Sequence, residues 1–356
     1  MITERIKKIQ NKLENNEAML ITSDCNRFYF TGFKSSAGTV VITKNKSYLL
    51  IDFRYIEKAK SVVKSSEVLL SQRVDAEIKE ILTANAIKKL FVETFSLSIS
   101  QFENYKNTFD GVEVSNCDEM NKYIEKMRSV KTEEEIGFIK KAQHFTDETF
   151  SYILERIEAG RTERDVMLDM EYYMRKIGSA EVGFDTIVVS GKKSSMPHGV
   201  PSDKKIEKGD FITMDFGSMY NGYRSDMTRT VAVGFVTDEQ KHIYDTVLRA
   251  QLAALKAVKA GVVCKDMDKI ARDIIYNEGY EGCFGHGLGH SVGIEIHECP
   301  NFNMRDETIL EEGTIMTVEP GIYVENFCGV RIEDMVVATR DGCINLTKSK
   351  KDLIIL

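Results

Sequence analysis

The pattern of apolar and polar positions divides the chain into two regions of different character. In residues 1–127, stretches with helical spacing alternate with short apolar runs, namely AMLITS, GTVVITK, SYLLID, EVLL and KLFVE. One helical stretch extends from about residue 53 to residue 64, and another begins near residue 75. Strands separated by helices are typical of an α/β sheet domain. We therefore predict a smaller α/β domain over residues 1–127.

The second region, residues 128–356, contains two long helices whose starts are marked in the sequence. Thr132 precedes Glu135 by three positions, and Thr237 precedes Gln240 by the same spacing. In such a capping box the first side chain and the third helical side chain each bind a backbone N–H group at the helix start. We predict a long helix after each threonine.

The segments that follow these two helices repeat. Each half reads as a helix, an Ala-Gly break, a second helix, a glycine stop and a β segment that contains histidine. The identities share an offset of 101 residues: Ala159-Gly160, Asp165 and Gly178 recur as Ala260-Gly261, Asp266 and Gly279. This repeat predicts two related α+β halves packed about a pseudo-two-fold axis, with a site between them.

A β-hairpin is predicted within FITMDFGSMYNGYRSDMTRTVAVG, residues 211–234. Asn221-Gly222 between runs of β-forming residues is a strong signal for a two-residue turn. With these residues at the centre of the turn, Tyr220 faces Tyr223.

The same register places two aspartates on one face of the hairpin. Asp215 faces Thr228, and Gly217 faces Asp226, where the missing side chain of the glycine is expected to leave space. Asp215 and Asp226 then lie roughly 7 Å apart as diagonal neighbours. Two converging carboxylates repel unless a cation lies between them. The hairpin alone leaves open whether they bind a cation or are solvated on an exposed face.

Four of the six histidines fall into two motifs. His198 lies in MPHGVP, and His286, His290 and His297 lie in GHGLGHSVGIEIHECP. The glycines of the second motif make a regular helix unfavourable, so its HxxxH spacing does not indicate a helical zinc site. On one regular strand His290 and His297 would point to opposite faces, so a bulge or bend must intervene if they share a site. Three histidines within twelve positions favour a site over isolated packing residues.

Two glutamates interrupt apolar runs near the C-terminus. GTIMTVEPGIYV and GVRIEDMVVA predict two strands joined by a short loop. Glu319 ends an apolar run before Pro320, and Glu333 interrupts the second run. A buried glutamate is costly unless it is paired or bound to metal. Pairing of Glu333 with Arg331, two residues away on the same face, is an alternative to metal binding that the sequence leaves open.

Together these motifs provide four carboxylates and one imidazole, each in a β context: Asp215, Asp226, His290, Glu319 and Glu333. The set is too rich in oxygen for structural zinc. It suits two divalent ions with at least one bridging carboxylate. Hard oxygen ligands favour manganese, with cobalt, iron or zinc as alternatives.

Composition narrows the class and the compartment. The chain has 356 residues, 42% of them hydrophobic, and a formal net charge of −7, which argues against nucleic acid as a main partner. We find no apolar core of a signal peptide and no apolar run near the ~20 residues that cross a bilayer. Seven scattered cysteines without a CxxC pair favour a reducing cytoplasm. The first region has no nucleotide-binding motif, and its Asp52, Arg54 and Tyr55 fit a surface ion pair beside a packed aromatic ring.

The order MDFG…SDMTRT…HGLGH…VEPG…RIED resembles the pita-bread metallopeptidases, and within them the proline-directed branch of Xaa-Pro aminopeptidases and Xaa-Pro dipeptidases. NRFYFTGF and IDFRYIEKA are similar to the creatinase-type N-terminal domain. The resemblance covers essentially the whole chain. It implies an α+β pita-bread catalytic domain of two related halves over residues 128–356, preceded by a creatinase-like α/β domain over residues 1–127.

The resemblance also implies roles for individual residues. Asp215, Asp226, His290, Glu319 and Glu333 match the ligands of two metal ions, which activate a water for attack on the peptide carbonyl. Glu319 matches the general base, and His198 and His297 match catalytic, substrate-side histidines. His286 and Arg331 match further substrate-binding positions, and Thr228 matches a partner of the metal-binding carboxylates. A homodimer is expected from the same resemblance.

One motif separates the two activities of this branch. Many prolidases have arginine directly after the proline of their HE-x-P segment, where it is placed to hold the carboxylate of a dipeptide. This chain has Asn301 there, with Arg305 nearby. We therefore predict an Xaa-Pro aminopeptidase acting on peptides with proline in the second position, with an Xaa-Pro dipeptidase as the alternative. A non-catalytic binding module and metal-free creatinase-like hydrolysis are disfavoured, because all five ligand positions are present.

Overall fold

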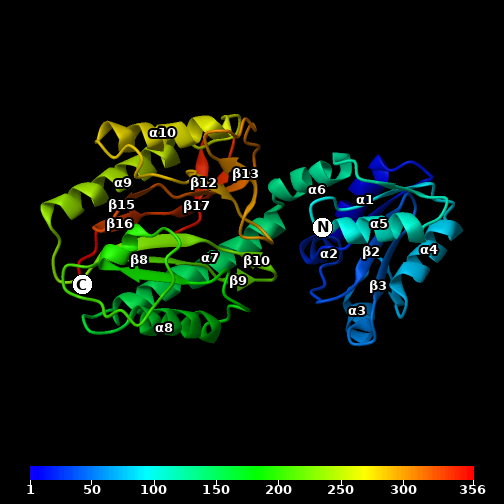
Figure 1. The fold of residues 1–356 in the computed structure, drawn as a ribbon, viewed down its shortest axis with the longest axis horizontal. Coiled ribbons are helices and arrows are strands. Elements are labelled where there is room, and N and C mark those ends of the chain that lie inside the picture. The colour runs from blue at the N-terminus through cyan, green and yellow to red at the C-terminus, as the bar shows by residue number, and fades with distance from the viewer. The chain divides into compact units, whose positions relative to one another are not determined.

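The computed structural model describes all residues from Met1 to Leu356, and they form two compact units, Met1–Met127 and Arg128–Leu356. We call them the N-terminal unit and the C-terminal unit, and describe each separately (Figure 1).

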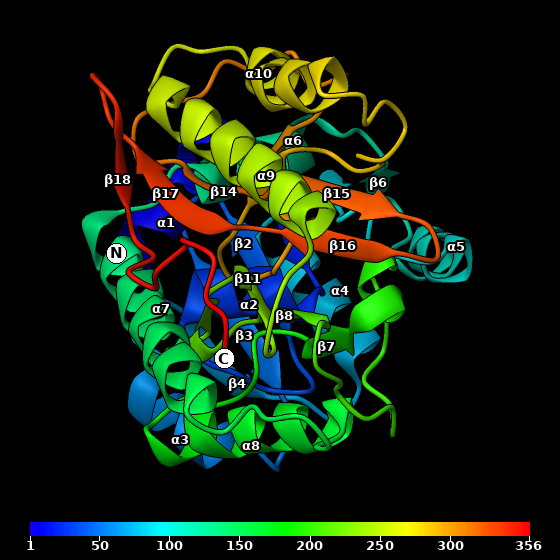
Figure 2. The same cartoon turned by 90° about the vertical axis from the view of Figure 1, so that its left-hand side faces the viewer.

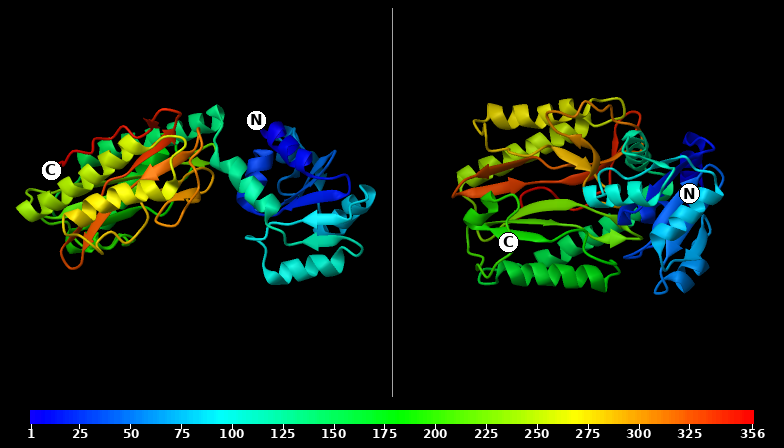
Figure 3. Two further views of the ribbon diagram at one scale, coloured as in Figure 1. Left: turned by 90° about the horizontal axis from the view of Figure 1, so that it is seen from above. Right: turned by 45° about the vertical axis from the view of Figure 1, so that its right-hand side comes forward.

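The N-terminal unit is a mixed six-stranded sheet with strand order β4-β3-β2-β1-β5-β6 and helices on both faces (Figure 3). Its strands are β1 (Glu17–Ile21), β2 (Thr39–Thr43), β3 (Ser47–Ile51), β4 (Glu67–Leu70), β5 (Lys89–Phe91) and β6 (Glu113–Ser115). Its helices are α1 (Ile2–Lys12), α2 (Asp24–Thr31), α3 (Ile56–Val62), α4 (Val74–Ala84) and α5 (Ile99–Thr108), and α6 (Glu119–Ser129) leads out of it. The antiparallel β1–β2–β3 meander is extended by parallel pairing at both ends.

The five strands and the helical stretches expected in this region are all present, whereas α2, α5, α6 and β6 were not predicted. Arg54 and Asp52 form an exposed ion pair with an N–O distance of 2.6 Å. The ring of Tyr55 packs edge-on against Phe33. The interpretation of these residues as a surface pair beside a packed aromatic ring is confirmed.

The C-terminal unit consists of two halves that meet along their strands. Its helices are α7 (Glu133–Leu154), α8 (Glu163–Lys176), the short η1 (Gly191–Ser195), α9 (Asp238–Ala257) and α10 (Cys264–Asn277). The strands of the first half are β7 (Ile187–Ser190), β8 (Phe211–Phe216), β9 (Met219–Tyr220), β10 (Tyr223–Arg224) and β11 (Met227–Ala232). Those of the second half are β12 (Gly289–Ser291), β13 (Glu298–Phe302), β14 (Ile315–Val318), β15 (Gly321–Val324), β16 (Cys328–Arg331), β17 (Asp334–Ala338) and β18 (Cys343–Asn345). Helices α7 and α8 lie on one side of the strands, and α9 and α10 lie on the other (Figures 1 and 2).

The predicted repeat is present in the backbone. Helices α8 and α10 begin and end at positions that differ by the same 101 residues as the sequence identities. Gly160 and Gly261 precede them with φ of 98° and 88°, a conformation that glycine adopts without strain. The N–H of Gly160 donates to Ile206 O, and the N–H of Gly261 donates to Leu310 O, both at 2.8 Å. Each half therefore turns its chain in the same way before its second helix.

Both predicted capping boxes are present, at Thr132 and at Thr237. A third, formed by Thr162 and Asp165, starts α8. At the equivalent start of α10, Val263 occupies the N-cap position without a side-chain cap.

The hairpin has the predicted register. Tyr220 pairs with Tyr223, and Asp215 pairs with Thr228. Asn221 and Gly222 both have positive φ, of 48° and 80°, as a two-residue hairpin turn requires.

The expected role of Gly217 was wrong. A side chain there would overlap the carbonyl oxygen of Ser225 and approach the ring of Phe184 to 3.0 Å. The glycine is needed because the two strands of the hairpin approach each other closely, and it does not leave space beside Asp226.

The two segments predicted as strands near the C-terminus each form two strands, so there are four. β14 pairs with β17 in a five-stranded sheet of order β13-β12-β14-β17-β18, whereas β15 pairs with β16 in a separate ribbon. The strands are interrupted at Glu319-Pro320 and again at Ile332-Glu333. At the second interruption, Glu333 N donates to Thr228 O of the first half. Proline has no N–H to continue a ladder, which explains the first break. Both glutamates therefore lie where the chain crosses between sheets, and not inside strands.

The C-terminal unit has two apolar cores. Residues of α7, α8, β8 and β11 form one core. Residues of α9, α10, β14 and β16 form the other, which Phe211 of β8 and Ala232 of β11 also join. None of the helices is long and apolar enough to span a membrane, and all seven cysteines are free thiols.

Candidate metal centre

Nine of the residues singled out from the sequence line one cavity of about 360 Å³ in the C-terminal unit. They are His198, Asp215, Asp226, His286, His290, His297, Glu319, Arg331 and Glu333. The first half contributes three of them and the second half contributes six. The pairing of β11 with β8 brings Asp215 and Asp226 to the cavity, as the hairpin register predicts.

Three of the proposed ligands already lie within coordinating distance of a common point. One ligand atom from each of Asp226, His290 and Glu333 lies within 4.8 Å of the other two. The Nε2 atom of His290 is 3.6 Å from Asp226 Oδ2 and 3.4 Å from Glu319 Oε1. These distances are too long for good hydrogen bonds and leave room for a cation among the atoms.

Burial and mutual repulsion make the charged forms of the carboxylates in this group unfavourable. Burial, followed by repulsion from Glu333 and Asp215, raises the pKa of Asp226 well above its ordinary value. Burial, followed by repulsion from Glu319 and Asp215, raises the pKa of Glu333 in the same way. Burial also raises the pKa of Glu319 to about 8. Without a cation, all three carboxyl groups therefore bind protons more readily than ordinary carboxyl groups do.

Two buried carboxylate oxygens have no hydrogen-bond partner, Asp215 Oδ1 and Glu333 Oε1. Buried polar atoms are normally paired, so oxygens of this kind indicate a missing positive partner. His290 fits the same picture, because burial and the neighbouring His297 lower its pKa to about 4 and keep the imidazole neutral. Its Nδ1 lies 3.1 Å from Ser291 O, which leaves the Nε2 lone pair facing the carboxylates. The residues present therefore fit divalent metal ions.

Two threonines orient the proposed ligands. Thr228 Oγ1 donates to Glu333 Oε2 at 2.7 Å, as expected for a partner of a metal-binding carboxylate. Thr317 Oγ1 donates to Glu319 Oε1 at 3.2 Å and accepts from the backbone N–H of His290 at 3.0 Å. Sequence reasoning missed Thr317. The available signal was its position two residues before Glu319 in the segment predicted as one strand, where such residues share a face.

The alternative in which Arg331 pairs with Glu333 is wrong. Arg331 Nη2 lies 2.7 Å from Asp215 Oδ2, and its Nε donates to Thr228 Oγ1 at 3.0 Å. The strand that carries Arg331 ends at this residue, so the period-two relation to Glu333 does not hold. Arg331 therefore joins the two halves, and Glu333 keeps a free oxygen.

The histidines converge as the motifs indicate. The ladder shifts register between His290 and Ser291, and a turn follows, so the rings of His290 and His297 come to 4.4 Å between centroids. This is the irregularity that the seven-residue spacing requires. Burial lowers the pKa of His297 and so favours the neutral ring. His198 lies after η1 and is exposed towards solvent.

His286 has a partner that the sequence did not reveal. Its Nε2 lies 2.8 Å from the hydroxyl of Tyr323, which also accepts from Arg331 Nη1 at 2.8 Å. Burial, followed by the charge of Arg331, lowers the pKa of His286 to about 4. Tyr323 therefore connects the histidine to the arginine that holds Asp215.

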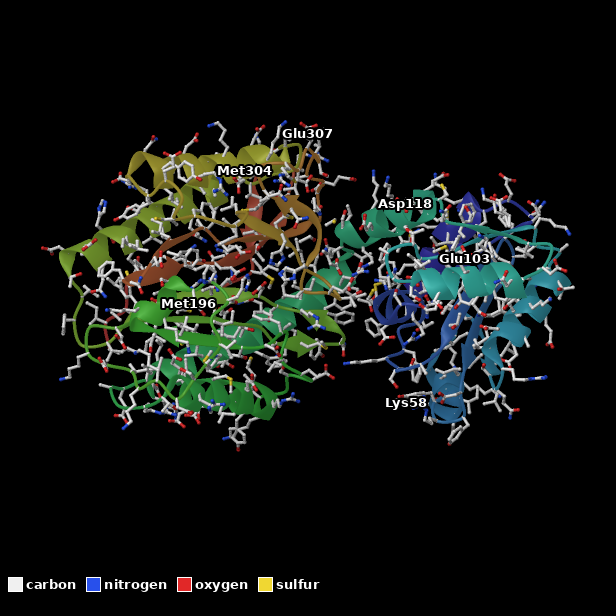
Figure 4. The ribbon with its side chains drawn as sticks, viewed as in Figure 1. Lys58, Glu103, Asp118, Met196, Met304 and Glu307 are labelled. Atoms are coloured by element: carbon white, nitrogen blue, oxygen red, sulfur yellow. The ribbon has the colours of Figure 1, made fainter.

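The residues after the HE-x-P segment separate into lining and surface positions. Asn301 and Asn303 line the cavity, whereas Arg305 is exposed and does not. Met196 and Met304, marked in Figure 4, are exposed near the His198 segment and in the loop after β13. Arg305 therefore does not replace the arginine found in many prolidases.

A unit of two related halves with carboxylates and histidines gathered where they meet is the architecture of the pita-bread metal-dependent hydrolases. Residues 137–340 match the model of metallopeptidase family M24, and residues 5–130 match the creatinase/prolidase N-terminal domain. The chain belongs to metallopeptidase family M24, which acts with divalent metal ions.

Relatives match along the whole chain. The Xaa-Pro dipeptidase of Pyrococcus furiosus is 40% identical over 354 residues, covering 99% of each chain. The structure of an Xaa-Pro dipeptidase from Bacillus anthracis aligns with a TM-score of 0.94 at 39% identity, covering 100% of this chain and 99% of the other. The structure of an X-Pro aminopeptidase from Thermotoga maritima aligns with a TM-score of 0.91 at 37% identity, covering 98% of this chain and 100% of the other.

Proposed function

We propose that this protein is an Xaa-Pro dipeptidase that hydrolyses the bond between an N-terminal residue and a following C-terminal proline. The observation that carries the proposal is the convergence of five potential ligands, two of them with unpaired buried oxygens, on one cavity. A volume of about 360 Å³ lies at the small end of ligand pockets and supports a short peptide substrate.

The choice of dipeptidase reverses the preference for an aminopeptidase drawn from Asn301. That preference rested on one position, whereas the relatives from Pyrococcus furiosus and Bacillus anthracis carry the dipeptidase name over nearly the full chain. An Xaa-Pro aminopeptidase remains the second candidate. It is supported by Asn301, which gives the cavity no cation at this position, and by the relative from Thermotoga maritima.

The five residues Asp215, Asp226, His290, Glu319 and Glu333 would hold two divalent ions, and their oxygen-rich character favours manganese. When bound, such ions supply Lewis acidity and lower the pKa of a water towards neutrality. We propose that Glu319 accepts the proton of the attacking water and returns it to the proline nitrogen, which must be protonated to leave.

Two histidines provide hydrogen-bond donors. His297 and His198 line the cavity on the substrate side, and each ring can present an N–H group to the carbonyl oxygen as negative charge develops. Arg331 is held against Asp215, so its contribution to substrate binding stays a prediction. A cytoplasmic location, supported by seven free cysteines, and a homodimer are proposed with the function.

Hydrolysis assays with added Mn²⁺ test the substrate class. Gly-Pro should be cleaved with at least about tenfold higher kcat/KM than Gly-Pro-Pro, since a cavity of this size favours the shorter peptide. Gly-Ala serves as the control without proline and should be cleaved poorly. Faster cleavage of Gly-Pro-Pro would favour the aminopeptidase. No cleavage of either proline peptide with Mn²⁺, Co²⁺, Zn²⁺ or Fe²⁺ would contradict the proposal.

A further inference from the structure

His297 lines the cavity, and its ring packs against the ring of His290, with 4.4 Å between the centroids. Its position therefore depends on this contact and on the backbone that carries it. That backbone is the segment of residues 292–297 between β12 and β13, which we call the His297 turn.

The residue that follows the turn, Glu298, is the centre of a buried charge cluster. Its side chain is only 5% exposed. Glu298 Oε1 accepts from the backbone N–H groups of Ile294 and Glu295 at 3.0 and 3.2 Å. The same carboxylate therefore closes the His297 turn from the inside, and it fills the space beside Gly293, where a side chain would clash with it.

Two cations from the start of the C-terminal unit hold this carboxylate. Arg128 Nη2 lies 2.5 Å from Glu298 Oε1, and Lys131 Nζ lies 3.2 Å from Glu298 Oε2. Burial opposes the charged form, but Lys131 and Arg128 outweigh it and lower the pKa of Glu298 to about 2. Glu298 is therefore ionised throughout the working pH range.

The cluster also reaches the strand that carries His290. Lys131 Nζ donates to Ser291 Oγ at 2.8 Å, and both side chains are buried. Lys131 thus connects β12, next to His290, with β13, next to His297. From the other side, Arg224 Nε donates to Ile294 O of the turn at 2.9 Å. The backbone of the turn is held on both sides, while the ring of His297 stays free to face a substrate.

We infer that Glu298, held by Lys131 and Arg128, is a positioning residue that sets the place of His297 in the cavity. This inference rests on the proposed function, in which His297 donates to the substrate carbonyl. Glu298 itself does not line the cavity and contacts no proposed metal ligand side chain. Its effect on the reaction must therefore pass through the turn.

A double-mutant cycle in the metal-loaded enzyme tests the inference. Glu298→Gln should lower kcat/KM for Gly-Pro by about 10- to 100-fold, mainly through kcat, because the donor is displaced in the transition state. In a His297→Ala background the same substitution should cost less than about twofold, since the group it positions is absent. Equal costs in both backgrounds would overturn the inference.

Glu307→Gln is the matched control, because Glu307 also ends a short ion pair, with Lys265 at 2.6 Å, but at the surface of the same half (Figure 4). It should leave kcat/KM unchanged within about twofold. If Glu298→Gln does not fold, Glu298→Asp keeps the charge opposite Lys131 but shortens its reach, and the same cycle applies to it.

Hydrogen–deuterium exchange gives a readout that does not depend on turnover. The amides of Ile294 and Glu295 should exchange at least about tenfold faster in Glu298→Gln, while amides of α10 stay unchanged. Unchanged exchange in the His297 turn would overturn the inference. A wild-type enzyme inert towards Xaa-Pro peptides would contradict the proposed function, and the exchange result would still decide whether Glu298 orders the turn.

Discussion

In the first half of the C-terminal unit, α8 begins at Glu163 after a capping box formed by Thr162 and Asp165. In the second half, α10 begins 101 residues later, after Val263, with Asp266 in place but no side chain to cap the helix. The helices and the glycines before them correspond position by position, and the apolar cores behind them are separate.

The loops of the two halves differ in their chemistry. The first half supplies two aspartates from a hairpin and one exposed histidine, whereas the second supplies three histidines and two glutamates from loops and strand ends. A partly buried pair anchors the segment of His198 in the first half, where Lys193 Nζ lies 2.7 Å from Glu163 Oε2 and donates to Val200 O. In the second half Arg272 pairs with Asp268 and donates to His286 O. The repeat thus preserves the scaffold, and each half has its own means of holding its histidine segment.

The largest expected effect comes from removing one ligand from each half. Asp226→Asn and His290→Ala should each lower kcat by about a thousandfold or more, because each leaves the metal ions without a full set of ligands. Bound metal, measured by elemental analysis, should fall in both variants. His242→Ala, at an exposed histidine of the second half, is the control and should be unaffected. Full metal content and full rate in either ligand variant would show that the ligand set is wrong.

Each half has a glycine packed closely against backbone, and replacing that glycine with alanine compares the two contacts. Gly217→Ala places it against Ser225 O, and Gly289→Ala places it against Thr317 O. Each should destabilise the protein by about 3 kcal/mol, because backbone cannot yield to the added group. Gly137→Ala, in the second turn of α7 with open space around it, should instead stabilise by about 0.5–1 kcal/mol. Thermal unfolding measures all three, and a tolerated Gly217→Ala would contradict the close approach.

Burial of Glu319, followed by repulsion from Asp215 of the other half, predicts a pH dependence of the metal-free protein. Glu319 has a pKa of about 8 in the fold against an ordinary value of 4.5, so the folded state binds its proton more tightly than the unfolded chain does. Stability is therefore highest below the ordinary value and falls as the pH rises towards 8. The melting temperature of metal-free protein should be a few degrees lower at pH 8 than at pH 6. Added Mn²⁺ should remove this difference, and a metal-free protein more stable at pH 8 would contradict the prediction.

The smallest effect concerns the helix starts. Thr162→Ala removes the cap of α8 and should destabilise by about 1 kcal/mol. Val263→Thr should give α10 the cap that its repeat partner has and stabilise it by about 0.5–1 kcal/mol, provided the threonine turns towards Asp266. Denaturant unfolding compares the two variants. A destabilised Val263→Thr would mean that the apolar contacts of valine outweigh the cap at this position.

Local signals in the sequence were sufficient for much of the scaffold. The turn at Asn221-Gly222 set the register of the hairpin, and the register placed Asp215 opposite Thr228. The threonine caps and the Ala-Gly breaks fixed where helices begin. All of these depend on residues within a few positions of each other, which is why a single sequence reveals them.

Features that depend on distant contacts could not be predicted. Arg331 pairs with Asp215, which lies 116 residues away, and not with the nearby Glu333. Lys131 and Glu298 are 167 residues apart, and nothing in their neighbours links them. The strand breaks at Glu319 and Glu333 were missed because they depend on which sheet each segment joins, and apolar runs do not show this.

The division of the proposed ligands between the two halves of the C-terminal unit has a practical consequence. The two aspartates of one half are not a complete set of ligands for two metal ions, and neither are the imidazole and two glutamates of the other half. A molecule in which one half has come apart would therefore release its ions even if the other half stayed native. The ratio of bound metal to protein in a purified sample would then report how many molecules have both halves correctly assembled, before any substrate is added.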